Sequence, residues 1–359
     1  MLVLLIIICI LVEYTIEFFL FSKYNQTPLF IETFDKSNEP YHPSVLYFKN
    51  GWNGFKYWMV ETPYPIGAST YRDRWECPSI HVSNDGVSWS VPLGLSNPID
   101  DLTEKQIINK DFFSDPHLVY VDNHIECFYR YSRRLIDGFH NYLVRKTSSN
   151  GINWHNKEIL IDMMDKNFSH TLGDIVRSPS IVYDERHYKM WYVDSINPNG
   201  RKHICFTTSI DGKNWQPHKK CILLGKNINP WHIDVAYIDG LYFLTIYDFY
   251  SLTIWAGKVE TEFSFIDVCF TPSLLKGSFY SDGLYRSSLI KDEKSFKLYF
   301  SAYSDKKTSL GLIEGKTINS LKIKSVSGCN VPFYNFTKTY ISIWKIRLWN
   351  IKNKWIKNR

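Results

Sequence analysis

Five apolar, strand-like segments of the chain open on side chains that can transfer protons or bind anions. These side chains are His42, Asp115, Arg177 with Ser178, His232 with Asp234, and Arg286. A further carboxylate, Glu76 in Trp75-Glu-Cys-Pro-Ser79, precedes a sixth segment of this kind. The set therefore combines two imidazoles and two guanidinium groups with carboxylates. Imidazole and carboxyl groups can act as general acids and bases, so the set is suited to acid–base catalysis.

Three of these carboxylates are candidate catalytic residues: Glu76, Asp115 and Asp234. Cleavage of a glycoside needs two carboxyl groups, one to protonate the leaving oxygen and one to act as base or nucleophile. Trp75 beside Glu76 offers the apolar surroundings that raise a carboxyl pKa into the general-acid range. Candidate substrate-binding residues are His42, Arg130, Arg177, His232 and Arg286.

The elements that position these residues are indicated by a repeated turn. Its three copies are Ser83-Asn-Asp-Gly-Val-Ser-Trp89, Ser148-Ser-Asn-Gly-Ile-Asn-Trp154 and Ser209-Ile-Asp-Gly-Lys-Asn-Trp215. Asp-Gly and Asn-Gly between extended segments predict hairpins with type I′ turns, because both residues tolerate positive φ. We expect the Trp side chains to pack between blades, so these turns define the fold and not the chemistry.

The repeat recurs about every 60 residues, a spacing typical of β-propeller blades. Five strand openings with four short strands each predict an all-β, five-bladed β-propeller over residues 40–315. In a propeller the first strand of every blade lines the central channel, and ligands bind in the funnel where these strands begin. The polar strand openings should therefore meet at one end of the channel.

Charge and cysteine content limit the other possibilities. Residues 315–359 contain ten Lys or Arg and no Asp or Glu, so the basicity of the chain lies in its tail and the body is mildly acidic. The seven Cys show no C-x-x-C spacing, so we expect no metal cluster and no disulfide framework. A nucleic-acid partner is not expected either, since no RNA-binding signature accompanies the basic tail.

Both ends of the chain are unusual. Residues 1–21 are a hydrophobic segment that is predicted to be a signal anchor or an atypical signal, with a translated upstream stretch or a packed helix as alternatives. Residues 330–359 form a basic tail, in which Ile341, Trp344, Leu348, Ile351 and Trp355 share one face of an amphipathic helix. Such a helix can bind an anionic membrane surface or pack on the propeller. A membrane-associated or extracytoplasmic location is therefore expected, with a cytoplasmic one as the alternative.

The blade number, the Ser-x-Asp-Gly-x-x-Trp turns and the Asp-Pro inner strand resemble the five-bladed β-propeller glycosidases, both the arabinanase and xylosidase type and the invertase type. The resemblance covers about residues 40–315 and suggests a divergent member of that superfamily. It implies that Asp115 orients the acid, that Arg286 faces substrate and that His232 helps to hold a central ion or water. No cofactor is expected otherwise, and a channel ion such as calcium stays open.

Two positions depart from the pattern of that superfamily. The catalytic carboxylate of blade 1 is replaced by His42, and the general acid of blade 3 by Arg177-Ser178. The prediction is therefore a glycan-active, glycoside hydrolase-like enzyme acting on a surface or extracellular polysaccharide through Glu76, Asp115 and Asp234. The alternative is a catalytically inactive propeller that binds oligosaccharides or polysaccharides in connection with their biosynthesis.

Overall fold

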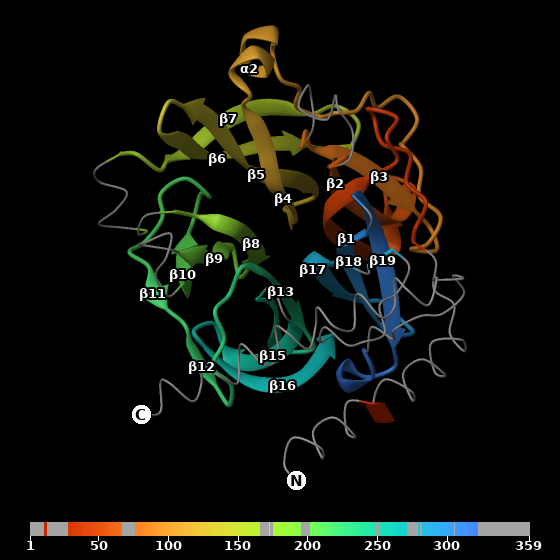
Figure 1. Ribbon diagram of the computed structural model, residues 1–359, viewed down its shortest axis with the longest axis vertical. Helices are drawn as coiled ribbons and strands as arrows, with labels where there is room; N and C mark the ends of the chain where they lie inside the picture. The colour runs from red at the N-terminus through yellow and green to blue at the C-terminus, as the bar shows by residue number, and fades with distance from the viewer. Residues whose placement is uncertain are drawn as a thin grey trace.

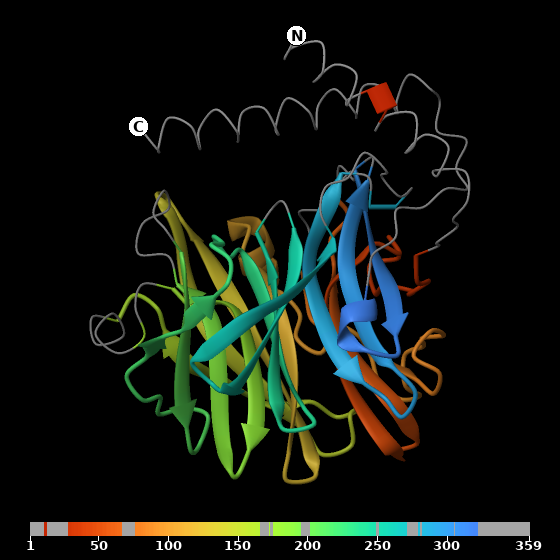
Figure 2. The same cartoon turned by 90° about the horizontal axis from the view of Figure 1, so that it is seen from below.

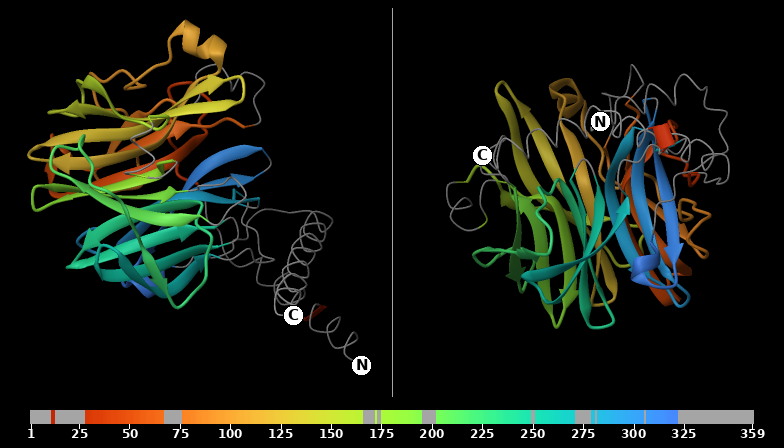
Figure 3. Two further views of the ribbon diagram at one scale, coloured as in Figure 1. Left: turned by 90° about the vertical axis from the view of Figure 1, so that its left-hand side faces the viewer. Right: turned by 60° about the horizontal axis from the view of Figure 1, so that its bottom comes forward.

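Five β-sheets lie around a common axis, as a five-bladed propeller requires (Figure 1). This computed structural model describes residues 11–12, 28–66, 76–165, 172, 175–194, 202–248, 251–270, 279–280, 282–304 and 306–321. The first strands of neighbouring blades contact one another around the whole ring. The side views show the sheets standing side by side around the axis (Figures 2 and 3).

The blades follow one another in chain order. Blade 1 contains β1 (Pro40–Trp52), β2 (Phe55–Pro63) and β3 (Ser79–Ser83). Blade 2 contains β4 (Phe112–Val121), β5 (His124–Leu135), β6 (Gly138–Ser148) and β7 (His155–Asp162). Blade 3 contains β8 (Arg177–Asp184), β9 (His187–Asp194), β10 (His203–Ser209) and β11 (Lys219–Lys220). Blade 4 contains β13 (His232–Ile238), β14 (Leu241–Tyr247), β15 (Leu252–Val259) and β16 (Glu262–Phe270), with β12 (Ile222–Leu224) parallel to β16. Blade 5 contains β17 (Gly283–Lys291), β18 (Phe296–Ser304) and β19 (Lys307–Gly315), before a short 3-10 turn η1 (Ile318–Ser320).

The expectation of four strands in every blade is wrong. Among the described residues blades 1 and 5 have three strands, while blade 4 gains β12 at its outer edge. The outer edge of blade 5 is instead covered by the segment that precedes blade 1, because the Leu29 N–H donates to the Leu310 carbonyl at 2.8 Å. Chain segments from before blade 1 and from blade 5 thus meet and close the ring.

The predicted end segments lie largely or wholly outside the described residues. Of the hydrophobic segment 1–21 only residues 11–12 are described, and none of the basic tail 330–359 is. Within the described parts of the chain, no helix is long and apolar enough to cross a membrane. The named helix there is α2 (Glu104–Asn109), which projects from the rim of blade 2 (Figure 1).

The three repeated turns share one hydrogen-bonding scheme. In the first, the Ser83 hydroxyl accepts from the Gly86 N–H at 2.9 Å, and the Asp85 carboxylate accepts from the Ser88 N–H at 2.7 Å. Gly86 has positive φ but Asp85 does not. The same holds for Gly151 and Asn150 in the second copy and for Gly212 and Asp211 in the third. The predicted type I′ geometry is therefore wrong, because the Asp or Asn side chain caps the turn and leaves only Gly in the left-handed region.

Each repeated turn packs against the neighbouring blade, as expected for a blade-packing motif. The Tyr299 hydroxyl of blade 5 donates to the Gly86 carbonyl of blade 1 at 2.9 Å. A Cβ at Gly151 of blade 2 would lie 2.1 Å from the Trp58 ring of blade 1. In blade 3 the Asp211 carbonyl accepts from Arg145 of blade 2 at 3.1 Å. Glycine is needed here because the adjoining blade occupies the space of a side chain.

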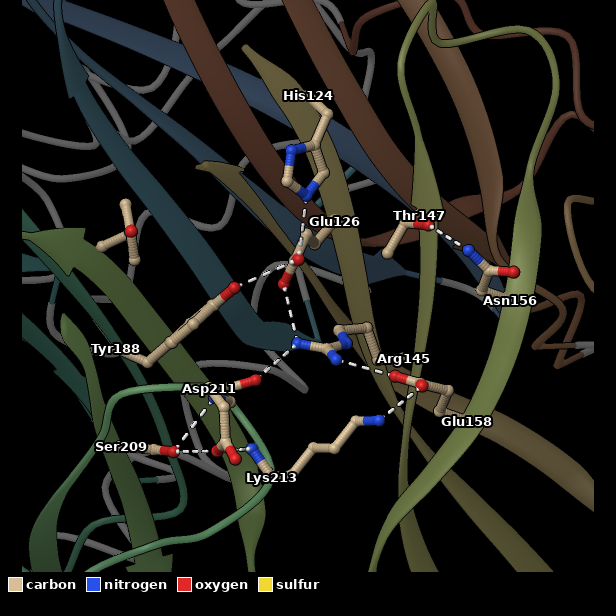
Figure 4. Close-up of polar contacts among 12 residues, drawn as sticks. His124, Glu126, Arg145, Thr147, Asn156, Glu158, Tyr188, Ser209, Asp211 and Lys213 are labelled. Atoms are coloured by element: carbon tan, nitrogen blue, oxygen red, sulfur yellow. Dashed lines mark hydrogen bonds and ion pairs between the residues drawn. The ribbon is translucent and has the colours of Figure 1, made fainter. Parts of the chain in front are cut away.

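The joint between blades 2 and 3 is also held by an ion-pair network around Arg145 (Figure 4). The buried Arg145 guanidinium lies 3.3 Å from Glu126 and 2.7 Å from Glu158. The Tyr188 hydroxyl of blade 3 donates to Glu126 at 3.1 Å, and Lys213 contacts Glu158 at 2.6 Å. These contacts fix the blades to one another and lie apart from the strand openings.

A pair of glycine substitutions tests the role of the repeated turn. Gly151→Ala and Gly54→Ala place a Cβ on backbones of similar φ, +74° and +88°, but only Gly151 meets a neighbour, since nothing lies within 4 Å of a Cβ at Gly54. The left-handed backbone costs about 1–2 kcal/mol in both variants. Overlap with Trp58 adds about 1–3 kcal/mol in Gly151→Ala alone. Denaturant unfolding measures the difference, and equal losses in both variants would contradict tight docking of the turn.

Candidate active site

The five inner strands bring one side chain each into a ring at the end of the channel where these strands begin. The ring is formed by the second residue of each opening, namely His42, Asp115, Ser178, His232 and Arg286, and all five are buried. The first three adopt positive φ, at 51°, 54° and 50°, and a shift of the strand register follows each of them. These bulges turn the side chains away from the regular sheet.

Asp115 contacts other polar groups of the site on several sides. Its carboxylate accepts from Arg130 Nε at 3.1 Å and from the Ser178 N–H at 3.4 Å, and lies 3.7 Å from His232 Nδ1. Burial acts to raise the pKa of Asp115, but the positive charge of Arg130, with a further contribution from Arg286, outweighs it and lowers that pKa below its ordinary value. Asp115 is therefore ionised at neutral pH.

Glu76 reaches the same ring from the segment that precedes β3. Its carboxylate lies 3.7 Å from His42 Nδ1, and the residue adopts positive φ (57°) while its N–H donates to the Pro63 carbonyl at 3.0 Å. Burial raises the pKa of Glu76 well above its ordinary value, Arg130 opposes this shift, and the negative charge of Asp115 adds to it. Burial therefore favours the protonated form of Glu76, whereas the charge of Arg130 favours the ionised form of Asp115.

Both imidazoles of the ring are neutral at pH 7. Burial lowers the pKa of His42 to about 3, although Asp115 acts in the opposite direction. Burial likewise lowers the pKa of His232 well below its ordinary value. His42 Nδ1 lies 2.8 Å from the Thr62 hydroxyl, whereas neither ring nitrogen of His232 has a hydrogen-bond partner among the residues that the structure describes. His232 is therefore a buried neutral imidazole, and its unprotonated ring nitrogen can accept a proton.

Asp234 lies one layer deeper in the channel than Glu76 and Asp115. It occupies the fourth position of its strand opening, at the level of Ser44, His117, Ser180 and Ser288, and it accepts from the Leu289 N–H at 2.9 Å. Asp234 and His117 line a cavity of about 370 Å³ that extends toward the ends of the inner strands. The fully buried Arg286 lies between the layers, since both Asp115 and Asp234 act on its charge. The structure thus brings Glu76 and Asp115 together and places Asp234 apart from them.

The depth of Asp234 predicts a pH-dependent stability. Burial raises the pKa of Asp234 from 3.8 to about 6. This carboxyl therefore stabilises the fold fully below about pH 4, and that contribution is lost as the pH rises through 6, by about 3 kcal/mol. Asp234→Asn should gain stability relative to the wild type by this amount between pH 4 and pH 7, as measured by denaturant unfolding. Asp239→Asn, the same change at an exposed carboxylate after β13, is the control, and an equal gain there would contradict the assignment.

The first residues of the strand openings add groups that the sequence reasoning did not select as site residues. They include Tyr41, Trp231 and Tyr285; the Tyr285 ring centre lies 4.0 Å from that of His232. The Arg177 guanidinium lies 4.5 Å from the Trp231 ring centre, and the Lys202 ammonium 3.8 Å. The sequence could have indicated Trp231 and Tyr285, because they directly precede His232 and Arg286. Residues that open adjacent inner strands share one end of the channel.

The ring contains side chains of the types that bind metal ions. His42, Glu76, Asp115 and His232 supply imidazole nitrogens and carboxyl oxygens, the donor types that divalent cations bind. In the part of the chain that the structure describes, no three His, Cys, Asp or Glu side chains converge closely enough to form a metal site.

Comparison with known proteins agrees with the fold. No protein-family model matches the chain. The A type blood N-acetyl-alpha-D-galactosamine deacetylase of Flavonifractor plautii is 28% identical over 236 residues, a match that covers 56% of this chain and 30% of that protein. The chain thus spans less than a third of the length of this curated relative.

Solved structures show the same architecture. An N-acetylgalactosamine deacetylase from F. plautii in complex with blood group B trisaccharide superposes with a TM-score of 0.61 at 19% identity, over 81% of this chain and 94% of that one. A GH43_1 enzyme from Xanthomonas citri complexed with xylotriose gives 0.57 at 9% identity, over 85% and 97%. A thermostable family-43 glycoside hydrolase gives 0.56 at 14% identity, over 82% and 95%. The resemblance to the five-bladed propeller glycosidases is thereby confirmed as a likeness of fold.

Proposed function

We propose that the protein is a glycan-active hydrolase that removes the acetyl group from an N-acetylated amino sugar of an oligosaccharide or polysaccharide. The observation that carries this proposal is the ring itself, in which an ionised Asp115 and a protonated Glu76 lie with two neutral imidazoles. The sequence similarity to a deacetylase supports the same reaction.

Four groups at the ring have roles in amide hydrolysis. The neutral His232 accepts a proton from water as the water oxygen bonds to the acetyl carbonyl carbon, and Asp115, 3.7 Å from His232 Nδ1, stabilises the imidazolium that forms. Glu76 donates its proton to the sugar nitrogen as the C–N bond breaks, because an amine leaves only when protonated. His42, 3.7 Å from Glu76, orients that carboxyl group. The products are acetate and the free amino sugar.

The missing carboxylates favour this reaction over glycoside cleavage. His42 and Ser178 occupy the strand openings where the resembled glycosidases place a carboxylate in blades 1 and 3. Deacetylation needs one base and one acid but not a pair of carboxyl groups across a glycosidic bond. The substitutions therefore remove carboxylates that glycoside cleavage uses, and they leave deacetylation possible.

Glycoside hydrolysis is the second candidate, because Glu76 and Asp115 still form a pair with opposite protonation states. In such a pair the protonated carboxyl is the acid and the ionised one the base or nucleophile. This reaction would use the residues that sequence analysis assigned to it, without Asp234.

The experiment that separates the candidates is an assay of the full chain on N-acetylated oligosaccharides. Acetate release without new reducing ends supports deacetylation, whereas new reducing ends without acetate support glycoside hydrolysis. Binding without either product identifies a glycan-binding propeller and contradicts both. Parallel reactions with a chelator and with added divalent cations test whether the imidazole and carboxyl groups act through a metal.

A further inference from the structure

We infer that the sugar bound at this site carries an anionic group, a carboxylate or a phosphate, which is recognised by a cationic cluster of Arg130, Arg177 and Lys202. The inference rests on the proposed function and deepens it by naming the substrate class. It comes from the side chains that adjoin the catalytic ring and not from the ring itself.

The cluster adjoins the ring through the chain and through contacts. Arg177 directly precedes Ser178, whose N–H donates to Asp115, and Arg130 donates to the same carboxylate. Trp231 directly precedes His232, and its indole ring has the Arg177 guanidinium at 4.5 Å and the Lys202 ammonium at 3.8 Å. An anionic substituent near the cluster would therefore belong to the same sugar chain as the reacting group.

The three cations lie together at a cost in electrostatic energy. Lys202 is only 8% exposed, and burial together with the nearby Arg177 lowers its pKa to about 8. Burial and the charge of Arg130 likewise lower the pKa of Arg177. Like charges held close in a poorly solvated place disfavour one another, and a bound anion relieves that repulsion.

The carboxylates of the ring do not balance this charge. Asp115 is ionised but is shared between Arg130 and the ring, while Glu76 is protonated. The charges of Asp115 and Asp194 partly offset that of Arg177, but among the described residues no ion pair within 4.0 Å involves the Arg177 guanidinium. The guanidinium of Arg177 therefore keeps hydrogen-bond donors for a ligand, and its planar fork matches a carboxylate or a phosphate equally well.

An aromatic series at the same end of the channel complements the cluster. The rings of Tyr64, Tyr41 and Tyr285 stack in succession, with centres 5.2 Å and 5.1 Å apart. Aromatic rings pack against the apolar face of a sugar, and Tyr285 also contacts His232. One end of the channel thus offers aromatic rings for a sugar face and cations for an acidic substituent, which is the combination that an acidic sugar needs.

The test compares acidic probes with their neutral counterparts. Hyaluronan tetrasaccharide, which contains glucuronate and N-acetylglucosamine, is titrated beside its carboxyl-reduced form, and N-acetylglucosamine 6-phosphate beside N-acetylglucosamine. The full chain should bind at least one acidic probe about tenfold or more tightly than its neutral partner, as charge-assisted hydrogen bonds predict. The pair that shows the larger ratio identifies carboxylate or phosphate, and the ratio should fall as salt is raised.

Two variants and one control assign the effect to the cluster. Arg177→Gln and Lys202→Met should abolish the preference by weakening the binding of the acidic probe far more than that of the neutral one, and Arg177→Gln suffices if Lys202→Met does not fold. Arg186→Gln, the same change at an exposed Arg in the turn after β8, should keep the preference. Equal affinity for acidic and neutral probes, no binding of either acidic probe, or an equal loss for both probes in Arg177→Gln overturns the inference.

The same measurements distinguish this inference from the proposed function. Acetate release from a neutral N-acetylated oligosaccharide, with no preference for acidic probes, leaves the reaction standing and overturns the charged substrate. Preferential binding of an acidic probe, with no acetate released from any substrate, supports the charged substrate and overturns the proposed deacetylation.

Discussion

Asp115→Asn is expected to lower kcat/KM for acetate release by at least about 100-fold, the lower end of the range for loss of a group that takes part in proton transfer. The asparagine keeps the shape and can still accept the Ser178 N–H, but it carries no charge. The imidazolium that forms on His232 then lacks its counter-ion 3.7 Å away. Arg130 also loses the carboxylate that it contacts at 3.1 Å, so its position is less well fixed.

Asp111→Asn is the matched control for this experiment. Asp111 is a buried carboxylate that directly precedes β4 and accepts from the Tyr131 hydroxyl at 2.6 Å, outside the ring. Both variants should stay folded, as thermal unfolding can confirm, and only Asp115→Asn should lose turnover. If activity on a glycan substrate is unchanged in folded Asp115→Asn, the carboxylate is not part of the reaction.

The repeat made much of this site predictable. Inner strands that begin in equivalent positions must end up side by side, so the meeting of His42, Asp115, His232 and Arg286 follows from the sequence alone. The greater depth of Asp234 requires the alternation within the strand, which a count of strand openings does not use. Asp234 is two residues beyond His232, so both side chains point to the same side but at different levels of the channel.

Other features depended on contacts that no local pattern encodes. The 3.7 Å approach of Glu76 to His42 requires a left-handed residue before β3 and a backbone hydrogen bond to Pro63. The closure of the ring at blade 5 depends on the pairing of Leu29 with Leu310, two residues far apart in sequence. The predicted strand openings were more reliable because each is set by its own short segment.

Glu76→Gln should reduce acetate release by about 100-fold to 10,000-fold, as expected for the loss of a general acid. The amide nitrogen of the substrate cannot leave as an anion, and glutamine has no proton to give it. Because burial raises the pKa of Glu76 well above its ordinary value, the wild-type kcat/KM should fall as the pH rises through that pKa. This alkaline limb should be absent in Glu76→Gln.

The leaving group gives an independent measure of the role of Glu76. An O-acetyl form of the same sugar releases an alkoxide, which departs more readily than an amide ion, so its hydrolysis should lose less in Glu76→Gln than that of the N-acetyl form. Glu61→Gln is the control, since Glu61 is a buried carboxyl of β2 that lies 3.1 Å from His81, and burial raises its pKa too. Because only Glu76 adjoins Asp115 and His42, Glu61→Gln should keep both activities. Equal losses on the two substrates in Glu76→Gln would assign Glu76 to binding and leave the proton to another group.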